Sequence, residues 1–290
     1  MRAVYGYCTR SWQPVKGCDM SLPCGKRCWA KRECHRLANH PNVQISTFHQ
    51  GLTDTRGNWT GAIKLNEEHL HDPVGWRDHE RIAVAYHGDL FLASDDVIGS
   101  VVQVIDVCPQ HTFLMLTKRV EEMRTVFSCG REFNDPWPSN LWLGFSITRQ
   151  SDADRSLEAA RTLAAAGWNM WCSYEPALEA VDWHGWEFLR FFVTGGESGR
   201  YARPAHVDWF RTARDWCLKA KVPFWFKQWG EWIPGFEING AGSARTNRRQ
   251  YCFPDGEWML RQAKKVRKEY AGGKAVLDAR EWNQLPEVRR

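Results

Sequence analysis

The chain has 290 residues, a formal net charge of +5 and a pI near 8.7. It is 43% hydrophobic and 25% charged, which is typical of a globular protein with a sizeable core. Its N-terminal segment lacks the apolar stretch of a signal peptide, and no run approaches the roughly 20 apolar residues of a membrane helix. These features disfavour a secreted or membrane protein and predict a cytoplasmic one, where thiols stay reduced.

Short aromatic and β-branched stretches alternate with helical patterns, which is typical of βα units and a parallel sheet. The predicted strands are residues 4–7, 43–48, 81–87, 112–117, 141–148, 169–175, 191–195 and 223–228. The predicted helices begin at Trp29 or span residues 95–107, 120–127, 152–166 and 208–220. This order predicts an α/β fold, a complete or partial (β/α) TIM-like barrel. A doubly wound open sheet is the alternative, because the pattern does not show closure.

The character of the chain changes after Trp232. Residues 235–247 are rich in Gly, Ser and Asn, and residues 261–268 are strongly basic. We therefore expect a barrel with an N-terminal cysteine loop over residues 1–232, and a basic C-terminal extension over residues 233–290 that packs on it.

Four of the ten cysteines cluster near the N-terminus. Cys18, Cys24 and Cys28 lie on one predicted loop, and three thiolates of this kind can hold a [4Fe–4S] cluster with one iron left open. Cys34 would close the site as a fourth ligand, giving structural zinc or an electron-transfer cluster. On the predicted helix, however, Cys34 and Cys28 should face different sides. From spacing alone, an iron–sulfur cluster and zinc both stay open.

A polar side chain follows nearly every predicted strand, and the C-terminal strand ends of a parallel barrel carry its functional site. We therefore expect a polar pocket at the barrel mouth. Its predicted members are Asp89, Lys118, Ser146, Glu175, Glu197 and Lys227 with Gln228.

Several side chains suggest ligand contacts. Lys118, Arg119 and Lys227 are candidates to anchor a carboxylate or phosphate. Tyr174 and Trp229 are candidates to stack a planar base, and the total of 17 tryptophans suits such a surface, although most should be core residues. No HExxH, GxSxG or phosphate-loop motif is present, which disfavours a zinc hydrolase and a nucleoside triphosphatase.

A series of short blocks carries a family resemblance. They are residues 11–18, 28–30, 61–65, 76–77, 89–91, 116–119, 141–144, 173–176, 195–199, 226–230, 272–274 and 277–278. On these blocks, from about residue 11 to 286, the chain resembles the phage Gp37/Gp68 family (DUF5131-type) of uncharacterised proteins. That family is itself similar to radical S-adenosylmethionine (radical SAM) enzymes. The spacing here is C-x5-C-x3-C rather than their common C-x3-C-x2-C, which leaves the middle ligand in question.

The resemblance implies a radical SAM barrel with two cofactors, a [4Fe–4S] cluster on Cys18, Cys24 and Cys28, and S-adenosylmethionine. Lys118, Glu175 and Lys227, which follow predicted strands, are the expected catalytic residues. Gly195, Gly196 and Glu197 resemble the glycine–glycine–acid turn that holds the methionyl amino group in those enzymes. The remaining expected cofactor-binding residues are Trp29, which would shield the cluster, Asp89 and Ser146.

The resemblance also implies an enzyme that generates a 5′-deoxyadenosyl radical, of the isomerase, mutase or base-modifying type. Its expected partners are an electron donor such as flavodoxin or ferredoxin and a nucleic acid or modified nucleotide. A hypermodified thymine base in phage DNA is the leading substrate, with the chain in the host cytoplasm and residues 261–268 on the phosphates. The alternative is a zinc-binding, nucleic-acid-binding protein without radical chemistry.

Overall fold

The computed structural model describes residues 6–21, 24, 27–128, 138–199, 201–234, 246–253, 259–263, 276–278 and 280–287. The chain forms two compact units. The N-terminal unit is Arg10–Phe145, and the C-terminal unit joins Met1–Thr9 to Ser146–Arg290. None of the helices in the described ranges has both the length and the apolar character that a membrane crossing requires. The expected division after residue 232 stays a prediction.

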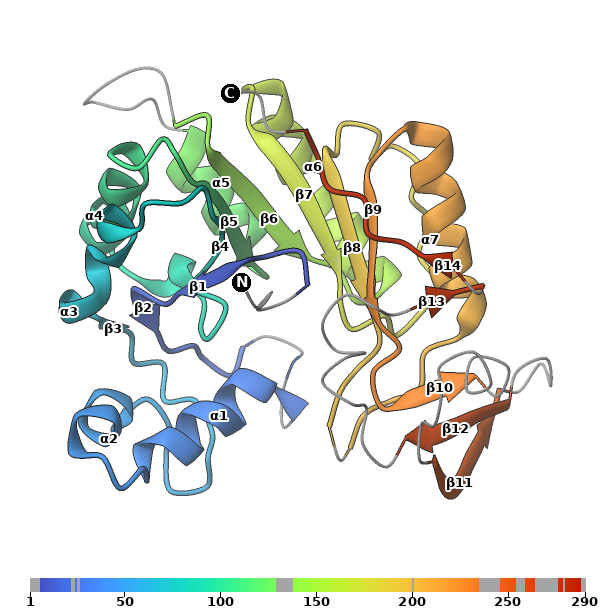
Figure 1. Cartoon of the computed structure of the whole chain (residues 1–290), viewed down its shortest axis with the longest axis horizontal. Coiled ribbons are helices and arrows are strands. Elements are labelled where there is room, and N and C mark those ends of the chain that lie inside the picture. Colours follow the sequence, from blue (N-terminus) through green and yellow to red (C-terminus); the bar gives the residue numbers. More distant parts are fainter. Residues whose placement is uncertain are drawn as a thin grey trace. The chain divides into compact units, whose positions relative to one another are not determined.

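The sheet of the N-terminal unit has parallel strands in the order β1-β4-β5-β6. They are β1 (Arg10–Trp12), β4 (Arg81–Val84), β5 (Thr112–Thr117) and β6 (Leu141–Ser146). Strands β4, β5 and β6 are nearly continuous apolar runs because both faces of the sheet are buried. Helices α4 (Asp95–Asp106) and α5 (Val120–Ser128) follow β4 and β5, so the predicted βα alternation is confirmed here (Figure 1).

Smaller elements lie between β1 and β4, and one 3-10 turn follows β4. They are β2 (Val15–Lys16), α1 (Trp29–Ala38), α2 (Val43–His49), β3 (Lys64–Leu65), α3 (Glu67–Leu70), and 3-10 turns at Asp72–Gly75 and Leu90–Leu92. The predicted strand at residues 43–48 is therefore wrong. Asn42 caps α2 by accepting a hydrogen bond from the amide of Ile45. Val43 is 74% exposed, so its β-branched side chain does not face a sheet core.

The first strand was predicted too early in the chain. Gly6 and Tyr7 are not in a strand, and residues 4 and 5 lie outside the described ranges. The first parallel strand is instead β1, where Trp12 pairs with Val84 of β4.

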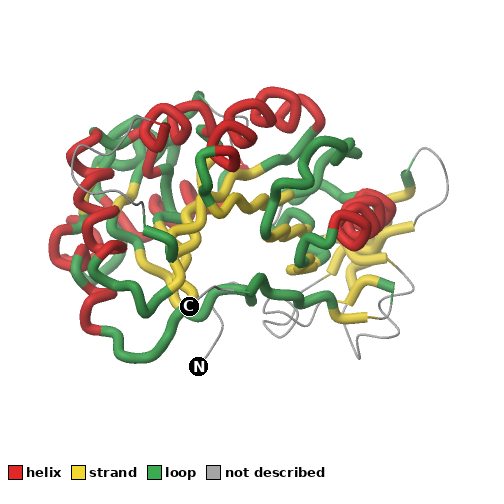
Figure 2. The backbone as a smooth tube through the Cα atoms, turned by 90° about the horizontal axis from the view of Figure 1, so that it is seen from above, coloured by secondary structure: helices red, strands yellow, loops and turns green. Residues whose placement is uncertain are grey.

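The C-terminal unit has its own parallel strands in the order β7-β8-β9. They are β7 (Asn169–Tyr174), β8 (Phe191–Gly195) and β9 (Phe224–Gln228). Helix α6 (Gln150–Ala165) packs against β7, and α7 (Val207–Ala220) packs against β8 and β9 (Figure 2). These elements match the predicted ones within two residues at each end.

A second, antiparallel sheet follows in the order β10-β12-β11. It contains β10 (Trp232–Pro234), β11 (Thr246–Cys252) and β12 (Met259–Ala263), and the hairpin of β13 (Val276–Leu277) and β14 (Arg280–Glu281) comes next. Most of the basic segment 261–268 lies outside the described residues.

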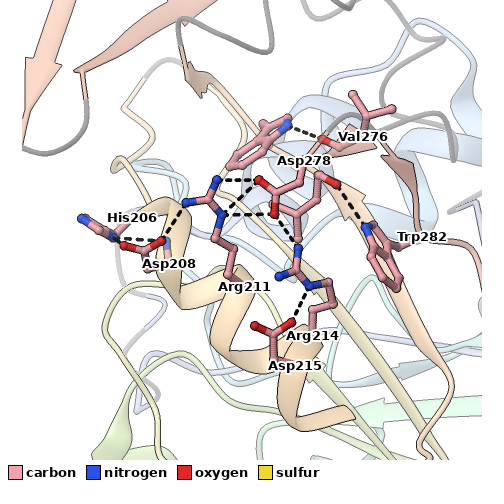
Figure 3. Close-up of polar contacts among 10 residues, drawn as sticks. His206, Asp208, Arg211, Arg214, Asp215, Val276, Asp278 and Trp282 are labelled. Carbon is pink, nitrogen blue, oxygen red and sulfur yellow. Dashed lines mark hydrogen bonds and ion pairs between the residues drawn. The ribbon is translucent and has the colours of Figure 1, made fainter. Parts of the chain in front are cut away.

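The end of the chain runs along β9. Asn283 forms an antiparallel bridge with Trp225, and the amide of Phe226 donates to the carbonyl of Trp282 at 2.8 Å. The carboxylate of Asp278 accepts hydrogen bonds from the guanidinium groups of Arg211 and Arg214 on α7 (Figure 3). The free edge of β9 is thereby covered by the chain's own C-terminal residues.

Aromatic side chains fill much of the core. Trp171, Phe191 and Trp225 surround Tyr7 at ring distances of 5.9 to 6.2 Å. The buried tryptophans are Trp12, Trp59, Trp142, Trp168, Trp171, Trp183, Trp186, Trp225, Trp229 and Trp282. The expectation that most tryptophans are core residues is therefore confirmed for the described ones. The fold is α/β, and its parallel βα repeats are compatible with a partial (β/α) barrel.

Candidate functional site

The cysteine loop begins at a close contact between two backbone segments. Gly17 has φ +117° and forms a parallel bridge with Gly88, and the amide of Asp89 donates to the carbonyl of Gly17 at 3.0 Å. A Cβ on Gly17 would lie 2.1 Å from the carbonyl oxygen of Ala62, so only glycine fits there. The carbonyl of Cys18 also accepts from Gly61 at 3.2 Å. The backbone of Cys18 is therefore fixed beside Asp89.

The three predicted ligand thiols are free and half-buried. Burial, together with the charges of Asp89 and Cys28, raises the pKa of Cys18 to about 12. Burial also raises the pKa of Cys24, against the lowering effect of Lys118. Cys28 caps α1, since its sulfur accepts from the amide of Lys31 at 3.5 Å. The charges of Asp89, Cys28 and Lys118 therefore act on these thiols.

The chemistry of these side chains fits a metal or cluster that takes sulfur ligands. As they stand, no group of three or more His, Cys, Asp or Glu side chains in the described ranges is arranged to hold a metal ion. Residues 22, 23, 25 and 26 of this loop lie outside those ranges. Cys18, Cys24 and Cys28 are the side chains of this loop that could supply sulfur ligands to such a group.

Cys34 lies closer to this loop than the sequence indicated. It is buried in an apolar cluster with Leu52 and Trp59, and both Cys18 and Cys28 pack against that same cluster. Burial raises the pKa of the Cys34 thiol to about 11. Cys34 and Cys28 thus border one apolar cluster, while the expectation that they face different sides of α1 stays a prediction and a fourth sulfur ligand stays open.

Asp89 is a buried carboxylate at the C-terminal end of the sheet. It accepts hydrogen bonds from the hydroxyl of Thr117 at 2.7 Å, the amide of Phe91 at 3.2 Å and the amide of Lys118 at 3.3 Å. Burial raises its pKa, although these hydrogen bonds oppose the shift. Asp89 thus joins the end of β5 to the chain that follows β4, next to the cysteine loop.

Trp29 follows the third cysteine and is 48% exposed. Its ring meets His87 edge-on at 4.9 Å, and burial lowers the pKa of His87 to about 4. Nearby, Lys16 of β2 donates a hydrogen bond to His49 at 2.6 Å. The predicted role of Trp29 as a shield for the loop stays a prediction.

In the C-terminal unit, Glu175 and Lys227 form an ion pair of 2.9 Å between largely buried side chains. Ser173 donates to the other carboxylate oxygen of Glu175 at 3.1 Å. The pair joins the residue after β7 to β9, across the end of β8, where Gly195 has no side chain. A Cβ there would lie 3.0 Å from Glu175 Oε1. The glycine therefore leaves the space that this ion pair occupies.

The next glycine allows a close approach of two chains. A Cβ on Gly196 would lie 2.0 Å from the carbonyl oxygen of Trp229, and one on Gly230, at φ +79°, would lie 2.2 Å from that of Glu197. Gln228 Nε2 also donates to the carbonyl of Gly196 at 3.2 Å. Backbone packing thus accounts for these glycines, while their predicted cofactor role stays a prediction.

Glu197 has a protein partner that the sequence did not indicate. Its two carboxylate oxygens accept from Arg203 Nε and Nη2, each at 2.8 Å, and the backbone amide of Arg203 adds a third bond of 2.8 Å. A bidentate pair of this kind holds the loop after β8 in place. A methionyl amino group would have to share this carboxylate with Arg203.

Three other predicted residues have clear positions. Ser146 ends β6 and is half-buried. Tyr174 and Trp229 are buried, with 0% and 7% exposure, and they donate hydrogen bonds to the carbonyls of Glu179 and Val276. The prediction that these two rings stack a base is therefore wrong, because neither ring is exposed to a ligand.

One comparison with known proteins gives a match. A family model described as "Protein of unknown function (DUF5131)" matches residues 3–286. No curated protein and no solved structure gives a significant match.

Proposed function

Since the chain belongs to the DUF5131 family of proteins of unknown function, we propose its function from its own residues: a radical SAM enzyme with a [4Fe–4S] cluster. The observation that carries this proposal is the set of three free thiols, Cys18, Cys24 and Cys28, on one loop. The backbone of Gly17 and Cys18, where this loop begins, is held beside the buried carboxylate of Asp89. Its resemblance to the cysteine loop of radical SAM enzymes favours iron–sulfur chemistry.

In this proposal the side chains of the protein bind and orient the cofactor and the substrate. When bound, the cluster and S-adenosylmethionine supply a 5′-deoxyadenosyl radical by one-electron cleavage of the sulfonium, the electron coming from a flavodoxin- or ferredoxin-type donor. Asp89 would accept a hydrogen bond from the cofactor's amino group or ribose, and Lys118 would bind an anionic group. Lys227, oriented by Glu175, would donate a hydrogen bond to a carbonyl or phosphate oxygen of the substrate.

For the substrate we propose a nucleic-acid base, such as a hypermodified thymine in phage DNA, that is modified or isomerised. The net charge of +5 and the basic residues 261–268 support a polyanionic partner. A base inside a duplex would have to be flipped out before reaction. Binding of duplex DNA should then weaken steeply with salt, and salt-independent or absent binding would remove this substrate.

The first test is anaerobic purification, with a visible spectrum and with iron and zinc counted on one sample. The proposal predicts a brown protein with about four irons per chain, lost in Cys24→Ala and kept in Cys252→Ala, since Cys252 is an exposed cysteine far along the sequence. The loaded protein should release 5′-deoxyadenosine from S-adenosylmethionine under reducing conditions. A colourless protein without iron would refute the radical mechanism.

The position of Cys34 favours a second candidate. Because Cys18, Cys28 and Cys34 border one apolar cluster, four thiols including Cys24 would suit a closed zinc site. This candidate, a zinc-binding protein that binds nucleic acid, predicts about one zinc per chain. Cys34→Ser should release that zinc, whereas it should leave the iron of a three-cysteine cluster in place.

A further inference from the structure

The guanidinium of Arg119 connects the end of β5 to the cysteine loop within the N-terminal unit. Its Nη2 donates to Asp19 Oδ1 at 2.6 Å and to Ser21 Oγ at 2.8 Å. Its Nη1 lies 3.3 Å from Glu122 Oε1. The side chain is only 10% exposed, so water competes little for these bonds. The sequence predicted that Arg119 anchors an anionic ligand. In the structure its guanidinium is instead paired with side chains of the protein.

The two loop residues that Arg119 contacts lie between Cys18 and Cys24. Asp19 also accepts from the amide and the hydroxyl of Ser21, at 3.1 and 2.7 Å, so its carboxylate organises the first turn of the loop. Asp19 directly follows Cys18 in the chain, so holding Asp19 also holds Cys18. Arg119 contacts this turn from the segment between β5 and α5.

The backbone of Arg119 is fixed as well. Its amide donates to the hydroxyl of Thr117 at 2.9 Å, and that hydroxyl donates to Asp89. The backbone amide of Asp89 in turn donates to the carbonyl of Gly17. Gly17 and Asp19 flank Cys18, so both neighbours of this thiol are tied to the same strand ends.

The surrounding charges suit this role. Burial lowers the pKa of Arg119, but the charges of Asp89, Asp19 and Cys18 outweigh burial and raise it. Arg119 Nε is also buried and has no hydrogen-bond partner within the described ranges. A guanidinium with one unused N–H beside a thiol loop could still donate to a sulfur-bearing group held there.

We propose that Arg119 is a positioning residue that latches the cysteine loop to β5 through Asp19 and Ser21, and so fixes Cys18 for metal binding. Lysine cannot replace it, because one ammonium does not reproduce a planar fork that meets Asp19, Ser21 and Glu122 together. This proposal extends the proposed function. It depends on that function only because it treats the cysteine loop as the metal site.

The first test uses the metal-free full-length protein. Hydrogen exchange of peptides covering residues 17–21 is measured for wild type, Arg119→Lys, Asp19→Asn and the double variant. Exchange should become about tenfold faster in each single variant, because a charge-assisted bond is lost. The double variant should add little more. Arg124→Lys is the matched control, since Arg124 forms an exposed pair with Glu121 on the same helix.

A second measurement follows the metal. After reconstitution with ferrous iron and sulfide, Arg119→Lys should lose iron to a chelator several-fold faster than wild type, and the reduced protein should show a changed electron paramagnetic resonance spectrum. Ser21→Ala removes the hydroxyl's bonds to Arg119 and Asp19 but leaves the Arg119–Asp19 pair, so it should show the same effects more weakly. It also keeps the test decisive if Arg119→Lys does not fold.

The outcomes separate the two proposals. Equal exchange at residues 17–21 in wild type and Arg119→Lys would overturn the latch, even if wild type binds iron. Additive effects of Asp19→Asn and Arg119→Lys would also overturn it. If the exchange result is as expected but wild type retains no iron, the latch stands and the proposed iron–sulfur function fails.

Discussion

Replacing one glycine by alanine should lower the stability of the folded chain at some positions and raise it at another. At Gly196, the added Cβ would lie 2.0 Å from the carbonyl oxygen of Trp229 and 2.7 Å from its carbonyl carbon. Contacts this short require the backbone after β8 or β9 to move by about 1 Å, because no flexible side chain can yield. Overpacking of a core costs about 1–3 kcal/mol, so a clash with backbone should cost about 3 kcal/mol or more.

Two other glycines calibrate this magnitude. Gly99 lies within α4 with open space around its Cα, so Gly99→Ala should stabilise the protein by about 0.5–1 kcal/mol through helix propensity. Gly167 also has open space but sits at φ +95°, so Gly167→Ala should cost about 1–2 kcal/mol from backbone strain alone. Any excess loss at Gly196 then measures the clash.

Urea unfolding of the three variants, followed by tryptophan fluorescence and circular dichroism, provides the assay. For a chain of this size, about 3 kcal/mol corresponds to a fall in Tm of roughly 6–12 °C. If Gly196→Ala is no less stable than Gly167→Ala, the close approach of Gly196 to Trp229 does not constrain the fold, and the packing account of these glycines is refuted.

Three further outcomes are expected. Lys227→Met should lower the free energy of unfolding in urea by about 2 kcal/mol, because it removes the cationic partner of the Glu175 carboxylate. The double variant with Glu175→Gln should lose less stability than the two single variants combined, and strict additivity would contradict the pairing. Because burial lowers the pKa of His87 from 6.5 to about 4, the unfolded chain binds more protons between these values, so stability should fall as pH drops from 6.5 to 4. His87→Gln should reduce this loss of stability by about 2–3 kcal/mol. A pH profile of stability equal to that of the wild type would contradict the assignment to His87. Asp278→Asn should weaken the hold of α7 on the C-terminal residues and speed their removal by protease, whereas equal cleavage rates would show that the bridge to β9 suffices.

The elements that the sequence predicted well have one property in common: their burial pattern is strong and local. Residues 112–117 and 191–195 are continuous apolar runs, and they coincide with β5 and β8. Residues 43–48 failed because Val, Ile and Phe there signal a strand, while the capping side chain of Asn42 and solvent exposure favour a helix. Strand β1 was missed because three residues that include Arg10 carry no periodic signal, and pairing with β4 defines them.

The candidate site was predictable in its residue types and less so in its contacts. The cysteine spacing and the polar strand ends identified Cys18, Asp89 and Lys227, which the structure places in two polar clusters, one in each unit. The partners of these residues come from distant sequence, as with Arg119 and Asp19, which are 100 positions apart. Pairings of this kind leave no local pattern, so sequence alone assigned Arg119 to a ligand.

The exposure of Trp29 gives the protein an optical property of its own. Most of its other tryptophans in the described ranges are buried, so their emission lies at shorter wavelengths than that of the solvated indole at Trp29. This indole immediately follows Cys28, within range for energy transfer to any coloured group on the loop. Detection at the long-wavelength edge of the emission band should therefore favour Trp29, and quenching of this emission would report loading of the loop in real time, without a label.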